Sequence, residues 1–238
     1  MDYNYENFEA NAYDLTAFRG PMPGTRAPDL PVLTRTGERQ SIVAFEGRFL
    51  VLEMGSITCP LYQGRRAAME AAARRHPDVS FAVLYVREAH PGAAIPAHRT
   101  LAEKQANARR LADHDHETRR VLVDDLQGSA HVAFGAYPNS VFIINQNGCV
   151  VYFSDWNNAS ATEDALNLLL DGKPAASVKS YFLPVHPKVS LRVLGNGGAG
   201  SMSDFLRSLP NLVWHNLIRR NFRLWRGRPS DVPPDVRC

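Results

Sequence analysis

One cysteine, Cys59, stands in a setting that favours a reactive thiolate. It directly follows the apolar run RFLVLEMG (48–55) and the short turn SIT, and it directly precedes the Ala-rich segment 60–76. This order predicts a buried strand, then a helix with Pro60 at its first position. Helix N-termini lower the pKa of a thiol, and Arg65 and Arg66 add positive charge. The sequence therefore predicts a nucleophile with a pKa below about 8.5, the alternative being an inert small residue at a strand end.

The other two cysteines give no comparable signal. Cys149 lies in the apolar run GCVVYF and is expected to be a buried core thiol, whereas Cys238 is the last residue and a candidate resolving partner for Cys59. Three scattered cysteines without a CxxC motif are too few for a disulfide framework or a four-ligand zinc site. No metal or bound cofactor is expected.

Composition narrows the protein class. The chain has 238 residues, of which 45% are hydrophobic and 21% charged, as in ordinary globular proteins. No run approaches the roughly 20 apolar residues of a spanning helix, and the start MDYNYENFEAN does not resemble a secretory signal. A cytoplasmic location is therefore expected. Nucleic-acid binding is not expected, because basic residues outside the C-terminal segment are balanced by acids.

Alternating strand and helix patterns surround Cys59. Further strands are expected at 79–86 and 119–125, a helix at 98–113, and a hairpin of 139–145 with 148–153 through an Asn-Gly turn. A last helix is expected at 160–172, with Ser160 as its N-cap. The order predicts a three-layer α/β/α domain with a mixed central sheet, which is typical of a thioredoxin-like fold.

Pro138 stands just before the first strand of this hairpin. Thioredoxin-like folds carry a cis-proline at this place, beside the active cysteine. A cis Tyr137–Pro138 bond is therefore one interpretation, and an ordinary proline at the start of an edge strand is the other.

Three segments resemble the iodothyronine deiodinase family. They are LVLEMGSITCP (50–60), LYVREAHP (84–91) and IPAHRTL (95–101), within a resemblance that runs from about Ala27 to Gly172. GSITCP, with Cys59 in the place of the family's selenocysteine, and EAHP at 88–91 are its most specific parts. The resemblance implies a peroxiredoxin-like thioredoxin fold and reductive dehalogenation.

By the same resemblance, Cys59 attacks the halogen of a small phenolic substrate, and an external thiol donor reduces the resulting intermediate. The implied proton-relay residues are Ser56, Tyr85 and Glu88. His90 and His98 are implied to handle protons or to bind the phenol. Ile57 stands where family members often carry a cysteine, so no resolving thiol lies nearby in the sequence.

Two other functions fit the same residues. A one-cysteine, peroxiredoxin-like thiol peroxidase or reductase is an alternative, because the Ser56 hydroxyl stands three residues before Cys59. A non-catalytic thioredoxin-like binding module is a second alternative. It requires neither GSITCP nor EAHP.

The chain divides into three parts. We expect an N-terminal extension (1–30), the thioredoxin-like domain (31–175) and a C-terminal extension (176–238) with a flexible GNGGAG linker at 195–200. Within the last part, 201–226 predicts a basic amphipathic helix kinked at Pro210, which docks on its own domain, forms a homodimer or contacts a membrane surface. The chemistry is expected to be complete without residues beyond Gly172.

Overall fold

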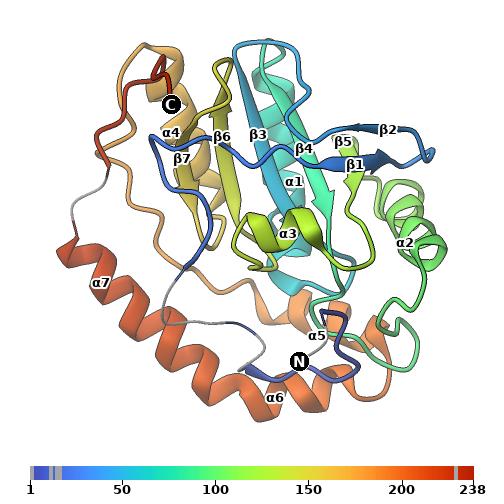
Figure 1. The fold of residues 1–238 in the computed structure, drawn as a ribbon. Helices are drawn as coiled ribbons and strands as arrows, with labels where there is room; N and C mark the ends of the chain where they lie inside the picture. Colours follow the sequence, from blue (N-terminus) through green and yellow to red (C-terminus); the bar gives the residue numbers. More distant parts are fainter. Residues whose placement is uncertain (1–2, 11–12, 14–17, 228–229) are drawn as a thin grey trace.

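A seven-stranded mixed sheet forms the centre of the molecule (Figure 1). The computed structural model describes residues 3–10, 13, 18–227 and 230–238. Among these the strand order is β2-β1-β5-β4-β3-β6-β7, with β3, β4 and β5 parallel and the other pairings antiparallel. The strands are β1 Pro31–Thr34, β2 Arg39–Ser41, β3 Phe49–Gly55, β4 Ser80–Tyr85, β5 Arg120–Val123, β6 Val141–Asn145 and β7 Val150–Ser154.

Helices cover the sheet unequally. One face packs against α1 (Pro60–Arg75), α2 (Leu101–Asp113) and α4 (Ala159–Leu170), and the other carries the short α3 (Ser129–Ala133) with irregular chain. Every residue of β3 is buried, because its alternate side chains fill the cores on both faces. The expected three-layer, thioredoxin-like fold is confirmed, although α4 begins after an Asn158 cap instead of Ser160.

The register of the two central strands brings two loops together. Gly55, the last residue of β3, pairs with Tyr85, the last residue of the parallel strand β4. Parallel strands end at the same edge of a sheet, where ligand sites of open α/β sheets are usually found. The turn 56–59 and the loop 86–91 therefore leave the sheet side by side.

A buried charge network lies beneath this edge. Arg119 donates to Glu53 at 2.7 Å and to Glu117, also at 2.7 Å, and all three side chains are at most 2% exposed. The remaining oxygen of Glu53 accepts bonds from Asn139 and Asn157. Each buried charge is thus compensated, which is the condition for keeping charge in an interior.

The C-terminal extension is more helical than the sequence predicts. The helix α5 (Pro187–Gly197) takes in half of the expected flexible linker. Helix α6 (Ser201–Leu212) then runs on through a π-helical stretch, η2 (Val213–Arg220), into α7 (Asn221–Arg226). Pro210 therefore lies inside a helix that continues past it and does not end there.

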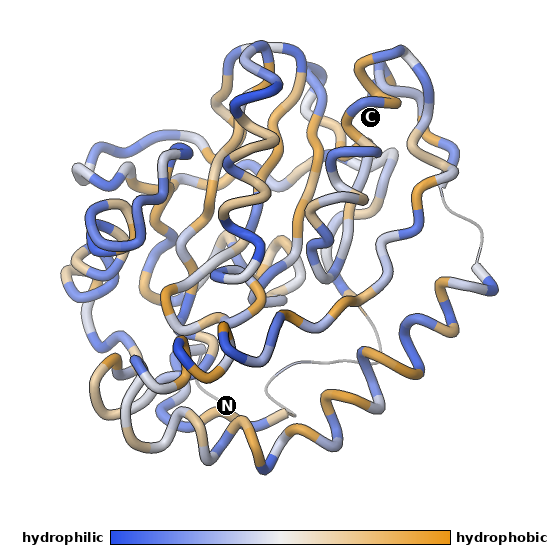
Figure 2. Tube along the Cα trace, turned by 180° about the vertical axis from the view of Figure 1, so that it is seen from behind, coloured by the Kyte–Doolittle hydropathy of each residue, from blue (hydrophilic) through white to orange (hydrophobic). Residues whose placement is uncertain are grey.

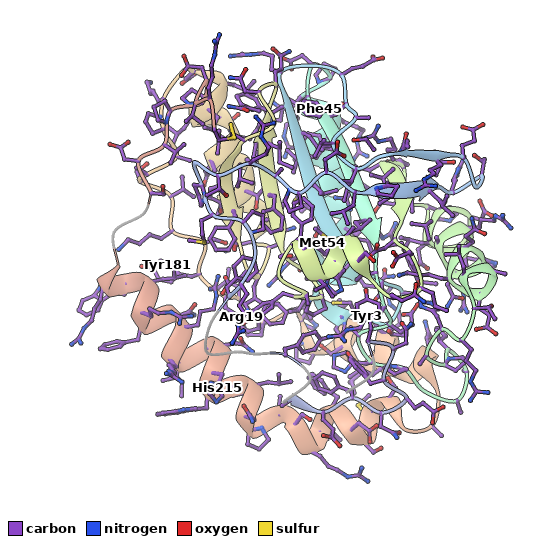
Figure 3. The ribbon with its side chains drawn as sticks, viewed as in Figure 1. Tyr3, Arg19, Phe45, Met54, Tyr181 and His215 are labelled. Atoms are coloured by element: carbon purple, nitrogen blue, oxygen red, sulfur yellow. A yellow bond between two sulfur atoms is a disulfide. The ribbon has the colours of Figure 1, made fainter. Side chains whose placement is uncertain are left out.

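The last residues return to the sheet and are fixed there. Cys238 forms a disulfide with Cys149, visible as a yellow bond in Figure 3. The side chains of Asn145 and Asn147 donate to backbone carbonyls of residues 234–236. The expectation of a free Cys149 thiol is therefore wrong, although the residue is buried as expected.

Two other expectations are settled by the backbone. No peptide bond among the described residues is cis, so the cis interpretation of Tyr137–Pro138 is wrong. A helix of the length and apolarity needed to cross a membrane is not found in the part of the chain that the structure describes.

Replacing Cys238 tests this attachment. The disulfide closes a loop with a sequence separation of 89 residues, so Cys238→Ser is expected to lower the free energy of unfolding in urea by about 2 to 4 kcal/mol. Wild type measured with a strong reductant is the control and should match the variant. Equal stability of the oxidised wild type and the variant would contradict the expectation.

Candidate active site

Cys59 caps the N-terminus of α1 and is buried. Its backbone is extended (φ −89°, ψ 107°), and Pro60 occupies the first helical turn as expected. Its side chain makes no capping hydrogen bond, but the backbone N–H groups of Tyr62 and Leu61 act on the sulfur to lower its pKa. The residue is only 2% exposed, so water does not surround the sulfur.

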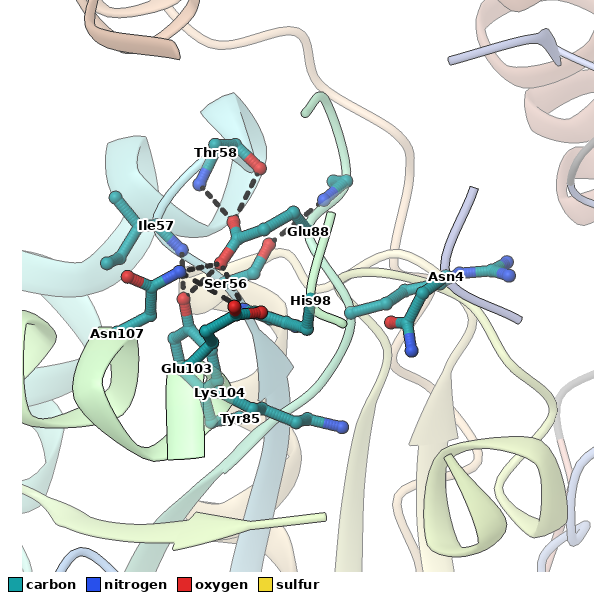
Figure 4. Close-up of polar contacts among 12 residues, drawn as sticks. Asn4, Ser56, Ile57, Thr58, Tyr85, Glu88, His98, Glu103, Lys104 and Asn107 are labelled. Atoms are coloured by element: carbon teal, nitrogen blue, oxygen red, sulfur yellow. Dashed lines mark hydrogen bonds and ion pairs between the residues drawn. The ribbon is translucent and has the colours of Figure 1, made fainter. Parts of the chain in front are cut away.

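Glu88 connects the segments around this cysteine (Figure 4). Its carboxylate accepts bonds from the backbone N–H and hydroxyl of Thr58 (3.1 and 2.7 Å), from the Tyr85 hydroxyl, and from Asn107 at 3.3 Å. His98 Nε2 lies 3.2 Å from the same carboxylate. Burial on its own raises the pKa of Glu88, but these bonds outweigh burial and leave the pKa below its ordinary value. Glu88 is thus a carboxylate that holds a proton on the Tyr85 hydroxyl.

Two hydroxyl groups of the turn before Cys59 hold the EAHP loop. Ser56 Oγ accepts from the backbone N–H of Ala89 at 3.2 Å, and Thr58 Oγ1 accepts from that of His90 at 3.1 Å. Sequence reasoning found Ser56 but missed Thr58 and Asn107. A Thr within two residues of a candidate nucleophile was the available signal for the former, whereas nothing local marked Asn107.

His90 lies between two aromatic rings from opposite ends of the chain. Its ring centroid is 4.1 Å from that of Phe8 and 5.4 Å from that of Phe205. Burial lowers the pKa of His90 to about 3, so the ring is neutral at physiological pH. The buried Nδ1 has no hydrogen-bond partner among the described residues and can bind a polar group of a ligand.

An apolar cavity of about 140 Å³ opens beside Cys59 and His90. Both extensions help to line it, through Phe8 from the N-terminal part and through Phe205, Leu209 and Val213 from the C-terminal helix. Residues beyond Gly172 therefore line the candidate site, while the expectation that the chemistry is complete without them stays a prediction. The predicted boundaries of the three parts stay predictions.

The N-terminal extension is attached through Arg87, directly before Glu88. The guanidinium lies 5.0, 4.7 and 4.9 Å from the ring centroids of Tyr3, Tyr5 and Tyr13, and Tyr5 also donates to the carbonyl of Ala89. Cation–π contacts of this kind are strongest when they are desolvated. They place Phe8 over the EAHP loop.

The expected lowering of the thiol pKa is wrong for this closed arrangement. Burial raises the pKa of Cys59 to about 11, and the N–H groups of Tyr62 and Leu61 and the charge of Arg65 offset burial only in part. Arg65 is itself buried and donates to Asn139 Oδ1 (2.8 Å) and the Leu183 carbonyl (2.7 Å). Arg66 instead pairs with Glu70.

The predicted residues are therefore gathered in one place. Ser56, Glu88 and His90 lie in the two loops beside Cys59, and Tyr85 ends β4. His98 comes from the segment just before α2 and joins them through Glu88. Cys238 is bonded to Cys149, so this candidate resolving partner for Cys59 is not a free thiol in the structure. No group of three or more His, Cys, Asp or Glu side chains able to hold a metal is found within the described residues.

Comparison with known proteins shows which protein family the chain resembles. The family model described as iodothyronine deiodinase matches residues 4–164. The thyroxine 5-deiodinase of Ovis aries is 32% identical over 151 residues, covering 58% of this chain and 51% of that protein. The human thyroxine 5-deiodinase is 30% identical over 151 residues, covering 58% and 49%. The chain thus spans about half the length of the curated relatives it matches.

Solved structures support the fold alone. An uncharacterized conserved protein from Geobacillus kaustophilus superposes with a TM-score of 0.53 at 18% identity, over 68% of this chain and 87% of that one. A hypothetical protein from Sinorhizobium meliloti 1021 gives 0.51 at 16% identity, over 68% and 91%. In both cases the superposition covers most of the solved chain and about two thirds of this one.

The reactivity of Cys59 with iodoacetamide tests its burial. Because the thiolate is the reactive form, we expect the alkylation rate to rise about tenfold per pH unit from pH 7 to 9, without a plateau. Mass spectrometry of the Cys59 peptide measures the rate, and the disulfide protects Cys149 and Cys238 from the reagent.

Matched arginine variants separate the contributions to this profile. Arg65→Gln removes a positive charge near the sulfur and is expected to shift the alkylation profile of Cys59 to higher pH. Arg66→Gln is not expected to shift it, because the charge of Arg66 already pairs with Glu70. A plateau below pH 8.5 in wild type would show that the thiol is activated and would contradict the expectation.

Proposed function

Because the chain belongs to the iodothyronine deiodinase family, we propose that it is a thiol-dependent oxidoreductase that removes halogen from an iodinated or otherwise halogenated phenol. The observation that carries the proposal is the apolar cavity in which the Cys59 thiol and the neutral His90 ring lie together. A halogenated ring is apolar and polarizable, and its hydroxyl is polar. The cavity offers a partner for each part.

In the proposed complex, His90 positions the substrate. Its unpartnered Nδ1 binds the phenol hydroxyl, while the cavity side chains pack on the ring. A buried polar atom without a partner favours ligands that supply one, since leaving it unpaired costs about 1 to 3 kcal/mol. This orientation brings the halogen toward the thiol.

The proposed reaction balances without a bound cofactor. The sulfur of Cys59 attacks the halogen, the carbon–halogen electron pair stays on the ring carbon, and that carbon takes up the proton that the thiol gives up. The products are the reduced phenol and a sulfenyl halide on Cys59. Tyr85, Glu88 and His98 form the hydrogen-bonded relay that moves the proton.

An external thiol completes the cycle. One thiol displaces halide from Cys59 to give a mixed disulfide, and a second thiol restores Cys59 and leaves as the oxidised disulfide. Ile57 and the bonded Cys238 support an external donor, because neither place offers a free thiol.

The alternatives and the cellular setting stay predictions. The raised pKa of Cys59 disfavours the thiolate that both peroxide reduction and attack on halogen need, so it does not distinguish the peroxidase alternative from the proposed reaction. A cytoplasmic location also stays a prediction, and the Cys149–Cys238 disulfide weighs against it, since disulfides persist mainly in oxidising compartments. A homodimer stays a prediction as well.

Variants of three residues test the proposal. With a dithiol and an iodinated phenol, Cys59→Ser is expected to abolish iodide release. His90→Phe keeps an aromatic ring but removes the nitrogen atoms, and it is expected to lower iodide release at least about tenfold. Glu88→Gln is expected to lower iodide release by at least the same factor. The measurement is iodide release under steady-state conditions, after circular dichroism has shown an intact fold.

The matched controls are Glu46→Gln and His114→Phe, both on the surface, which should release iodide at the wild-type rate. Rapid peroxide consumption by wild type, with no halide released from any halophenol tested, would favour the peroxidase alternative. Neither activity with several thiol donors would favour the binding module.

A further inference from the structure

The long C-terminal helix presents a polar stripe to the protein, next to the apolar residues that line the cavity. Between residues 204 and 220, buried side chains follow one another four or eight residues apart. They are all polar or charged: Asp204, Ser208, Asn216 and Arg220. A regular α-helix would turn such a stripe gradually away from the protein, and the wider turns of η2 correct this drift. Arg220 is fixed by its ion pair with Asp155 and by the Ser180 carbonyl.

The outer side of the same helix is apolar, an inversion of the usual amphipathic arrangement. We call Leu206, Trp214, Ile218, Phe222 and Trp225 the outer apolar face; their exposed fractions lie between 49% and 63%. In Figure 2 this helix runs along the rim of the molecule with hydrophobic segments recurring along it. An exposed apolar patch of this kind marks a contact with a partner or a membrane.

A basic stripe borders the outer apolar face. It is formed by the exposed residues Arg219, Arg223 and Arg226, whereas Arg207 pairs with Asp204. His215 lies on the same helix and is labelled in Figure 3. The sequence has no Asp or Glu between Asp204 and Asp231. Asp204 pairs with Arg207 at 3.0 Å and offsets only that arginine, so whatever covers the face meets an excess of positive charge on the helix.

We propose that the outer apolar face binds an anionic membrane surface, with the helix lying in the plane of the interface. Trp214 and Trp225 suit the headgroup boundary, and the arginines complement anionic headgroups. A second copy of the chain fits less well, because residues 201–226 carry five arginines against the single Asp204, and pairing two such helices would bring these like charges together.

This orientation also concerns the active site, an aspect that rests on the proposed function. Leu209, Val213 and Leu217 lie on the helix next to the outer apolar face and line the cavity beside Cys59. A helix bound to the interface therefore places the cavity close to the hydrocarbon region. An apolar phenol dissolved in the lipid then has a short path to the thiol.

Vesicle binding by the full chain tests the membrane proposal without using activity. Phosphatidylcholine vesicles with and without phosphatidylserine are sedimented with the protein at low and high salt. We expect binding to the anionic vesicles, weakened by salt. Trp214→Ser is expected to lower the partition coefficient at least about tenfold, and Arg219→Gln about fivefold.

The matched controls are Val132→Ser and Arg74→Gln, at exposed positions on α3 and α1, which should bind as wild type does. Binding that is unchanged in Trp214→Ser, or equal for neutral and anionic vesicles, would overturn the proposal. The proposal would also be overturned if wild type bound no vesicles but formed a dimer in analytical ultracentrifugation, and if Trp214→Ser dissociated that dimer. Loss of iodide release with vesicle binding intact would contradict only the proposed function.

Discussion

A buried carboxylate needs hydrogen-bond donors around it, and the donors that surround Glu88 determine the arrangement of this site. Its donors come from the turn after β3, the end of β4 and helix α2, so one side chain fixes three segments relative to one another. Removing one partner from such a cluster leaves a charge without compensation, which is strongly destabilising. The positions of Cys59 and His90 depend on this cluster, since both lie in the segments it joins.

Two physical effects oppose each other at the Cys59 sulfur. The helix N-terminus and Arg65 favour the thiolate, whereas the apolar cover of Phe8 and Phe205 around the cavity favours the neutral thiol, and burial prevails. Both the proposed dehalogenation and peroxide reduction begin with attack by the thiolate, so the raised pKa of Cys59 disfavours the first step of each. The two reactions differ in what the site must supply next. Dehalogenation has to deliver a proton to the ring carbon, and the hydrogen-bonded Tyr85 and Glu88 lie beside Cys59 for that step.

The sequence predicts well what local patterns determine. The runs of apolar residues give the strands of the sheet, and the order strand, cysteine, proline, helix gives the place of the nucleophile. The disulfide, the raised pKa of Cys59 and the role of Asn107 each depend on residues far apart in the chain. The Cys149–Cys238 pair, for example, exists because the tail returns to the β6–β7 hairpin, and no periodicity records that path.

The C-terminal helix shows why a strongly amphipathic pattern does not by itself say which side faces the protein. Burial of its apolar side against the domain is the ordinary expectation, yet Asp155 and the Ser180 carbonyl offer partners that only a polar side can use. With Arg220 held there, Leu209 and Val213 of the same helix line the cavity, and the next row of apolar side chains is left outside. The buried ion pair is thus compatible with only one orientation of the helix, the one that leaves the outer apolar face exposed.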